Sequence, residues 1–148
     1  MRPEEIKPDT KLCTIIGFNA QTGKRREYFN KILKLNSINA TAIALNIKEE
    51  HFQFTMKNLP NSKVNRVVLD NEFQTLALEF CNNSKELDRV DFIEVVDKKI
   101  IGYSINIENI IENPKFFDEN MILATKMMIL ANRWYEAKID IDLIPTII

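Results

Sequence analysis

The chain of 148 residues is 45% hydrophobic and 28% charged with a formal net charge of −1, a composition typical of one globular domain. A charge so close to zero creates no long-range field for nucleic acid or an anionic membrane, so we expect neither as a partner. The sequence has no uncharged apolar stretch of about 18 residues and no apolar leader at its start, so we expect a cytoplasmic protein.

Cysteine and histidine usage argues against several kinds of site. Cys13 lies in an apolar run and Cys81 in a helical pattern, with no Cys-x-x-Cys motif, so both are predicted to be buried free thiols. His51 is the single histidine, whereas a structural zinc site needs about four Cys or His ligands and acyl-transfer triads depend on a histidine. We therefore predict no metal site, no such triad, and an exposed His51 on a helix.

In chain order, the first three predicted strands are each followed by a predicted helix. Short runs of β-branched and small apolar residues predict the strands, and apolar residues at helical spacing predict the helices. The strands are expected at 12–18, 40–47 and 63–70, and the helices at 26–35, 49–59 and 71–83. This alternation is typical of parallel strands joined by crossover helices.

The next two apolar runs, 90–97 and 98–105, are joined by the tight turn Asp97-Lys98 and predict a β-hairpin. A short helical piece at 106–113, a boundary at Pro114 and a long helix from about residue 117 follow. We therefore predict a three-layer α/β fold, with a mostly parallel sheet of about five or six strands that carries one antiparallel pair.

One domain is expected over residues 1–148, with an α/β core at 11–112, the long helix at 116–137 and an apolar tail at 138–148. The long helix contains "MILATKMMILANRWY", which is apolar nearly all round, although a helix on one side of a domain needs only an apolar stripe. Two interpretations remain open. Helix and tail pack back on the sheet, or the 117–148 region forms the surface of a homodimer or binds another protein.

Several short motifs follow one another along the chain. Gly17 begins the run Gly-Phe-Asn-Ala-Gln-Thr-Gly-Lys-Arg-Arg, residues 66–72 read Arg-Val-Val-Leu-Asp-Asn-Glu, Gly102 begins Gly-Tyr-Ser-Ile-Asn, and Trp134 lies near the end of the long helix. This order resembles the Gly-x-Pro-x-x-His-Ser-x-Ser-Pro, Asn-Val-Thr-x-Pro-x-Lys and Gly-x-Asn-Thr-Asp motifs of shikimate dehydrogenase, followed by its closing helix with a tryptophan. The resemblance covers about residues 11 to 137 and implies the substrate-binding N-terminal domain plus the closing C-terminal helix.

The resemblance implies that the catalytic residues of the family are replaced. Glu72 stands at the position of the catalytic lysine and Asn106 at that of the catalytic aspartate, while both serines of the first motif are absent. The family's Gly-Ala-Val-Asn-Thr resembles residues 91–95, which puts Glu94 at the substrate-binding asparagine, and Lys126 stands at the substrate-binding glutamine.

The resemblance also implies that the nicotinamide-binding Rossmann domain is missing. The sequence has no Gly-x-Gly-x-x-Gly, and its three glycines, Gly17, Gly23 and Gly102, could not build one. We therefore predict no cofactor and no catalytic residue for dehydrogenation.

Two candidate binding sites follow. Open α/β sheets bind ligands at the carboxyl ends of their strands, so one cleft for a small hydroxy acid or anion is expected there. Its predicted substrate-binding residues are Arg25, Val68, Glu72, Glu94, Asn106 and Lys126. The alternative is that these side chains are simply solvated.

The second candidate is an anion site at a helix N-terminus, formed by Gly23, Lys24, Arg25 and Arg26. Its alternative is a solvated basic cluster paired with Glu27.

The predicted function is a catalytically inactive, shikimate dehydrogenase-like protein with a non-enzymatic role in small-molecule binding or regulation. Two alternatives are an interaction module that uses the apolar C-terminal helix and a small enzyme that uses Glu72 and Glu94 as an acid/base pair.

Overall fold

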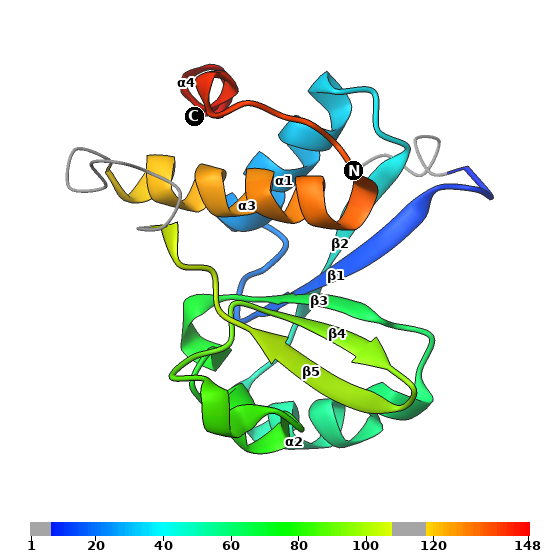
Figure 1. Ribbon diagram of the computed structural model, residues 1–148. Helices are drawn as coiled ribbons and strands as arrows, with labels where there is room; N and C mark the ends of the chain where they lie inside the picture. Colours follow the sequence, from blue (N-terminus) through cyan, green and yellow to red (C-terminus); the bar gives the residue numbers. More distant parts are fainter. Residues whose placement is uncertain (1–6, 108–117) are drawn as a thin grey trace. The chain divides into compact units, whose positions relative to one another are not determined.

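The computed structural model describes residues 7–107 and 118–148, so the boundary predicted at Pro114 and most of the helical piece predicted at 106–113 lie outside the described residues. The chain divides into two compact units. The sheet unit comprises Cys13–Thr22 and Ile43–Ile105, and the helical unit comprises Met1–Leu12, Gly23–Ala42 and Asn106–Ile148. The colour bar of Figure 1 locates these segments.

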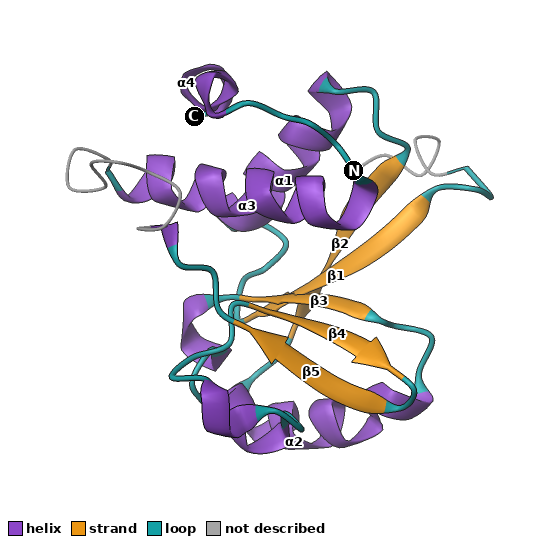
Figure 2. Ribbon diagram, in the orientation of Figure 1, coloured by secondary structure: helices purple, strands orange, loops and turns teal. Residues whose placement is uncertain are grey.

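A mixed sheet of five strands confirms the predicted α/β fold (Figure 2). β3 runs parallel to β1, whereas β4 runs antiparallel to both of its neighbours, β3 and β5. The strand order is β2-β1-β3-β4-β5, with bounds β1 Lys11–Gly17, β2 Ala40–Asn46, β3 Arg66–Leu69, β4 Phe92–Val96 and β5 Lys99–Tyr103.

The predicted hairpin is confirmed as β4 and β5. Its turn residues Asp97 and Lys98 have φ values of 51° and 62°. Two consecutive positive φ values are typical of the primed turns whose twist matches that of the flanking strands. The turn therefore needs the left-handed conformation at both positions, although neither residue is a glycine.

The core of the sheet unit lies between the strands and helix α2 (Glu49–Asn58). Phe52 and Met56 are one helical turn apart and both are buried, so they form the inward face of α2. Phe52 stacks on Phe73, with 4.3 Å between the ring centroids. Buried apolar residues from β1, β3, β4 and β5 complete this core: Ile16, Val67, Leu69, Ile93 and Ile100.

The prediction of a single helix at 71–83 is wrong. The segment instead forms two short 3₁₀ helices, η3 (Asn71–Phe73) and η4 (Leu76–Phe80), and a third, η5 (Ser84–Glu86), follows it. Phe73, Ala77 and Cys81 are buried at intervals of four, which explains the helical pattern. At Cys81 the backbone becomes extended and the chain turns to bond β5 instead of continuing a helix.

Asparagine side chains close the outer edge of β5. The backbone N–H of Asn82 donates to the carbonyl of Ile100 (2.8 Å), and its Oδ1 accepts from the backbone N–H of Ile100 (2.9 Å). The Asn83 amide repeats this pattern with Gly102, at 2.8 and 2.9 Å. Because an open edge strand can template pairing with another chain, these bonds protect the sheet from extension on this side.

Gly102 is required by the same packing. A Cβ atom there would lie 2.7 Å from the Cys81 Sγ and 3.1 Å from a Leu87 methyl group. The glycine inside β5 therefore permits the close approach of the 3₁₀ segment.

In the helical unit, α1 (Lys24–Leu35) packs on α3 (Glu119–Tyr135). The Phe29 ring meets the Trp134 ring edge to face, with 6.2 Å between centroids. Asp118 caps α3 by accepting from the Met121 backbone N–H at 2.8 Å. The predicted long helix is confirmed, with slightly narrower bounds.

The apolar tail packs on these helices of its own unit. It forms a short helix, α4 (Ile144–Ile147), which contacts both α1 and α3 and buries Ile144 and Ile147. The Lys31 Nζ donates to the Ile147 carbonyl at 2.9 Å. Ile144 and Ile147 are therefore covered within the chain, whereas Ile148 is 45% exposed. No helix among the described residues is long and apolar enough to cross a membrane.

The contribution of the Asn83 hydrogen bonds with Gly102 to stability can be tested by substitution. Asn83→Asp replaces the amide donor by a carboxylate oxygen facing the Gly102 carbonyl, so we expect a loss of about 1–3 kcal/mol in the free energy of unfolding. Urea denaturation measures it. Asn61→Asp introduces the same charge at an exposed position and should change stability little. Equal effects of the two substitutions would contradict a capping role for Asn83.

Candidate functional site

The carboxyl ends of β1 and β3 meet at one edge of the sheet, because the two strands are parallel and Ile16 is level with Leu69. Gly17 ends β1, and a Cβ atom at this position would lie 2.0 Å from the Asp70 Oδ2. The glycine predicted at this turn is therefore required by the Asp70 side chain. The Asp70 backbone N–H donates to the Ile16 carbonyl at 2.9 Å, which fixes this edge further.

Glu72 lies at the same edge and holds the loop that follows β1. Its Oε1 accepts a hydrogen bond from the Phe18 backbone N–H at 2.7 Å. The Phe18 ring meets the Phe73 ring edge to face, with 5.1 Å between centroids. The Glu72 carboxylate therefore positions the backbone of the loop.

Asp91 is a buried carboxylate that the sequence analysis missed. The side chain is only 4% exposed, and it accepts from the Ile105 backbone N–H (2.7 Å), the Arg89 Nε (3.1 Å) and the Gln74 Nε2 (3.4 Å). A buried carboxylate is tolerated when it is paired and hydrogen-bonded in this way. With these donors in place, Asp91 acts as an anchor between segments and not as a free base.

A cavity of about 600 Å³ opens beside this edge within the sheet unit. Phe18, at the end of β1, lines it together with residues at the end of β2 and the start of α2: Asn46, Ile47, Lys48, Glu49 and His51. The Ile47 backbone N–H donates to the Gly17 carbonyl at 3.0 Å, so the ends of β1 and β2 are tied together. The volume lies in the range of small-molecule sites.

The polar lining of this edge cavity combines one lysine, one glutamate, one histidine and one amide: Lys48, Glu49, His51 and Asn46. Lys48 is an exposed cation, and His51 is exposed on α2 as predicted, with its Nε2 3.5 Å from Glu50. The Asn46 side chain accepts from the Gln21 backbone N–H at 3.0 Å, which fixes the neighbouring loop. Apolar surface comes from Phe18, which is 45% exposed, and from Ile47.

The structure corrects the position of Glu94. Glu94 on β4 is level with Arg66, the first residue of β3, whereas Glu72 follows the last residue of that strand. β4 is antiparallel, so the chain enters it at the carboxyl edge and moves away from that edge. The predicted carboxylate pair of Glu72 and Glu94 is therefore wrong. Asp91, at the start of the same motif, is the residue that lies at the edge.

The other predicted substrate-binding residues divide between the two units. Val68 is 1% exposed within β3 of the sheet unit. Arg25 is buried in α1, Lys126 is half-buried on α3 and Asn106 is exposed, all three in the helical unit. A cleft shared by these residues and Glu72 stays a prediction.

The basic cluster after Gly23 shows the paired arrangement. The Lys24 Nζ lies 3.1 Å from a Glu27 carboxylate oxygen, and this hydrogen bond raises the pKa of Lys24. The Arg26 Nε donates to the Ala42 carbonyl at 3.1 Å, and Arg25 is 8% exposed. The alternative of a cluster paired with Glu27 therefore describes Lys24 better than an open anion site does.

Both cysteines are free and buried, as predicted. Burial raises the pKa of the Cys81 thiol to about 11, so this thiol stays protonated near neutral pH and is a poor nucleophile. Across residues 7–107 and 118–148, no group of three or more His, Cys, Asp or Glu side chains could hold a metal ion.

A comparison with models of protein families found no match, and neither did one with curated proteins. Solved structures do match. The shikimate dehydrogenase of Aquifex aeolicus is 19% identical at a TM-score of 0.60, over 74% of this chain and 43% of that protein. The chain has the fold of part of a shikimate dehydrogenase. The resemblance found in the sequence is thus confirmed at the level of fold.

Two further matches show the same fold. The Listeria monocytogenes shikimate 5-dehydrogenase, solved with shikimate and NAD, is 10% identical at a TM-score of 0.60, over 74% of this chain and 39% of that one. The 5-ketofructose reductase of a Gluconobacter species is 9% identical at a TM-score of 0.59, over 76% and 42%. The chain therefore spans less than half the length of these dehydrogenases and this reductase.

The role of Glu72 can be tested by substitution. Glu72→Lys removes the acceptor of the Phe18 N–H, so we expect a loss of about 0.5–1.5 kcal/mol in the free energy of unfolding. Glu72→Gln keeps an oxygen at the same place and should lose less. Glu79→Lys makes the same charge change at an exposed residue and is the matched control. Equal losses for Glu72→Lys and Glu79→Lys in urea denaturation would disprove the positioning role.

Proposed function

We propose that this shikimate dehydrogenase-like protein lacks dehydrogenase activity and binds a small hydroxy acid or another small anion at the carboxyl edge of its sheet. The observation that carries the proposal is the bond between Glu72 and the Phe18 N–H. Through this bond Glu72, which the resemblance puts at the position of the catalytic lysine, holds the backbone of the loop after β1. A cytoplasmic location belongs to the same proposal.

Dehydrogenation requires an acid/base pair beside the substrate hydroxyl and a bound nicotinamide. Glu72 has the opposite charge to lysine, and Asn106 carries an amide that neither accepts nor donates a proton near neutral pH. The described residues do not fit a dinucleotide either. Phosphate-binding loops depend on clustered glycines. Gly17, Gly23 and Gly102 form no such cluster, and the basic residues Lys24 and Arg26 after Gly23 already bond Glu27 and the Ala42 carbonyl.

The edge cavity supports the binding half of the proposal. It offers one lysine, one histidine, one glutamate and an amide beside the apolar surface of Phe18 and Ile47. A small hydroxy acid has a carboxylate for the cation and hydroxyl groups for the polar side chains. Its ring or carbon chain would cover the apolar wall.

The two alternative functions have less support. Met127 and Trp134 on α3 are 1% and 5% exposed, so these side chains are not available to a homodimer or a protein partner on the 117–148 region. A small enzyme would need Glu72 and Glu94 to act together. Glu94 on β4 is level with the first residue of β3, whereas Glu72 follows the last residue of β3.

Ligand binding can be tested by thermal shift with shikimate, quinate and phosphate. A ligand at a hundredfold excess over its Kd adds about 2.7 kcal/mol to stability, which raises the Tm by several degrees in a domain of this size. We expect a saturable shift with a hydroxy acid that Lys48→Gln weakens. Lys57→Gln, at the exposed far end of the same helix, is the control and should bind as wild type. No shift with any of the three compounds would contradict the proposal.

Catalysis is tested separately by absorbance of the reduced cofactor. With NADP and shikimate we expect no reduction above a heat-treated control. The double substitution Glu72→Lys, Asn106→Asp should not create activity, because it supplies no binding site for the cofactor. Clear turnover by the unaltered chain would show that it is a dehydrogenase.

A further inference from the structure

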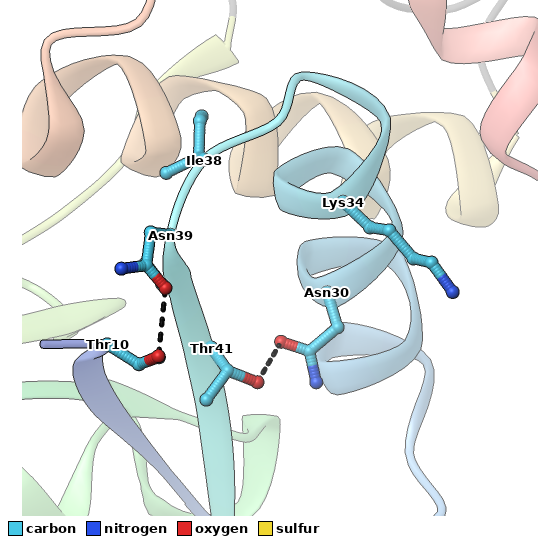
Figure 3. Close-up of a pocket in the computed structure, with 7 residues that line it drawn as sticks. Thr10, Asn30, Lys34, Ile38, Asn39 and Thr41 are labelled. Atoms are coloured by element: carbon cyan, nitrogen blue, oxygen red, sulfur yellow. Dashed lines mark hydrogen bonds between the residues drawn. The ribbon is translucent and has the colours of Figure 1, made fainter. Parts of the chain in front are cut away.

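A second cavity opens in the helical unit, at the amino ends of β1 and β2 (Figure 3). Its volume is about 450 Å³. We call it the amide pocket, after the two asparagines among its lining residues: Thr10, Asn30, Lys34, Ile38, Asn39, Ala40 and Thr41. None of these residues takes part in the function proposed above.

Hydrogen bonds fix one wall of the amide pocket. The Thr10 Oγ1 donates to the Asn39 Oδ1 at 2.8 Å, and the same hydroxyl accepts from the Lys7 backbone N–H at 2.9 Å. The oxygen of Asn39 is therefore engaged as an acceptor. Its Nδ2 has no partner in the part of the chain that the structure describes, so it remains available as a donor.

The other wall is fixed by Asn30 on α1. Its Oδ1 accepts from the Ala42 backbone N–H (2.8 Å) and from the Thr41 Oγ1 (3.3 Å), while its Nδ2 donates to the Ala42 carbonyl (3.2 Å). Two donors occupy the amide oxygen, whereas the Nδ2 carries a second hydrogen beyond the bond to Ala42. Again the acceptor is used and a donor is left over.

Among the lining residues in the described part of the chain, Lys34 is the one with an ionisable side chain. It lies in the last turn of α1, is exposed, and forms no ion pair with any residue in 7–107 or 118–148. In Figure 3 its side chain lies on the same side as Asn30 and extends away from Asn39 and Thr10. The flexible four-carbon stem lets the ammonium group turn over the mouth of the pocket.

We propose that the amide pocket binds a small anion, with its carboxylate or phosphate group bonded to Lys34 and to the Asn39 amide. Within residues 7–107 and 118–148, the pocket lining has one cation, unused amide donors and no acidic side chain, while its amide oxygens already accept hydrogen bonds. A ligand rich in acceptors complements such a lining, and a cation or a donor-rich ligand does not. Ile38 and Ala40 offer apolar contact to the rest of the ligand.

The test is a titration of the ¹⁵N-labelled full chain with inorganic phosphate and, separately, with citrate, followed by the side-chain amide signals of Asn30 and Asn39. We expect saturable shifts with a Kd of about 1 mM, a weak affinity that fits a site with a single cation. Lys34→Gln removes the cation. Asn39→Asp keeps an oxygen for Thr10 but removes the donor and adds a negative charge.

Each of these two substitutions should weaken binding by about tenfold or more, whereas Lys57→Gln should leave it within about twofold of wild type. Lys57 is the matched control because it is also an exposed lysine in the last turn of a helix. Unsaturable shifts with both anions, or unchanged binding by Lys34→Gln, would overturn the proposal. Lys34 is exposed, so this variant decides the question even if Asn39→Asp does not fold. Which anion binds more tightly identifies the group, carboxylate or phosphate.

Discussion

The carboxyl edge of the sheet depends on one buried carboxylate. Asp91 lies just before β4, and its side chain bonds the backbone just after β5, the Arg89 guanidinium and the amide of Gln74 beside η3. The Arg89 guanidinium also donates to the Ile105 carbonyl at 2.7 Å, which closes the cluster. Removing a partner from such a buried pair leaves an uncompensated charge, which is far more costly than losing an exposed ion pair. The hairpin and the 3₁₀ segment are therefore held to the same edge that carries Glu72 and the edge cavity.

Much of the fold could be predicted because apolar periodicity records which residues face the core. β1, β2, α1 and α3 were predicted close to their observed bounds for that reason. The same signal failed at 71–83, where residues buried at intervals of four imitate a helix. There the backbone bonds to β5 decide the conformation, and those bonds join residues that are distant in sequence.

The candidate site was less predictable than the fold. Alternation along β4 shows which face a residue occupies, but the level of Glu94 along the strand depends on its register with β3. Asp91 gave no local signal, since its donors on Gln74 and Ile105 reach it only through tertiary structure. Gly17 ends β1 and Glu72 comes shortly after β3, so the strand pattern alone indicates that both lie near this edge.

The fold alone leaves the chemistry open. The same architecture occurs in shikimate dehydrogenases and in a 5-ketofructose reductase, so similarity of fold does not decide what this chain binds. Particular side chains support binding without dehydrogenation. The Glu72 carboxylate accepts the Phe18 N–H, the Asn106 amide is neither an acid nor a base near neutral pH, and Lys48, Glu49 and His51 line the edge cavity.

The amides at the two ends of the sheet have a consequence for self-association. Asn82 and Asn83 bond β5 as a sixth strand would, and Asn30 does the same for Ala42 of β2. Fibrils grow when identical strands stack through unpaired backbone groups. In this chain those groups are already bonded at these positions, by side chains too short to continue the ladder. The sheet therefore ends where the asparagines lie, and a second copy of the chain meets side-chain amides at these places instead of an open strand.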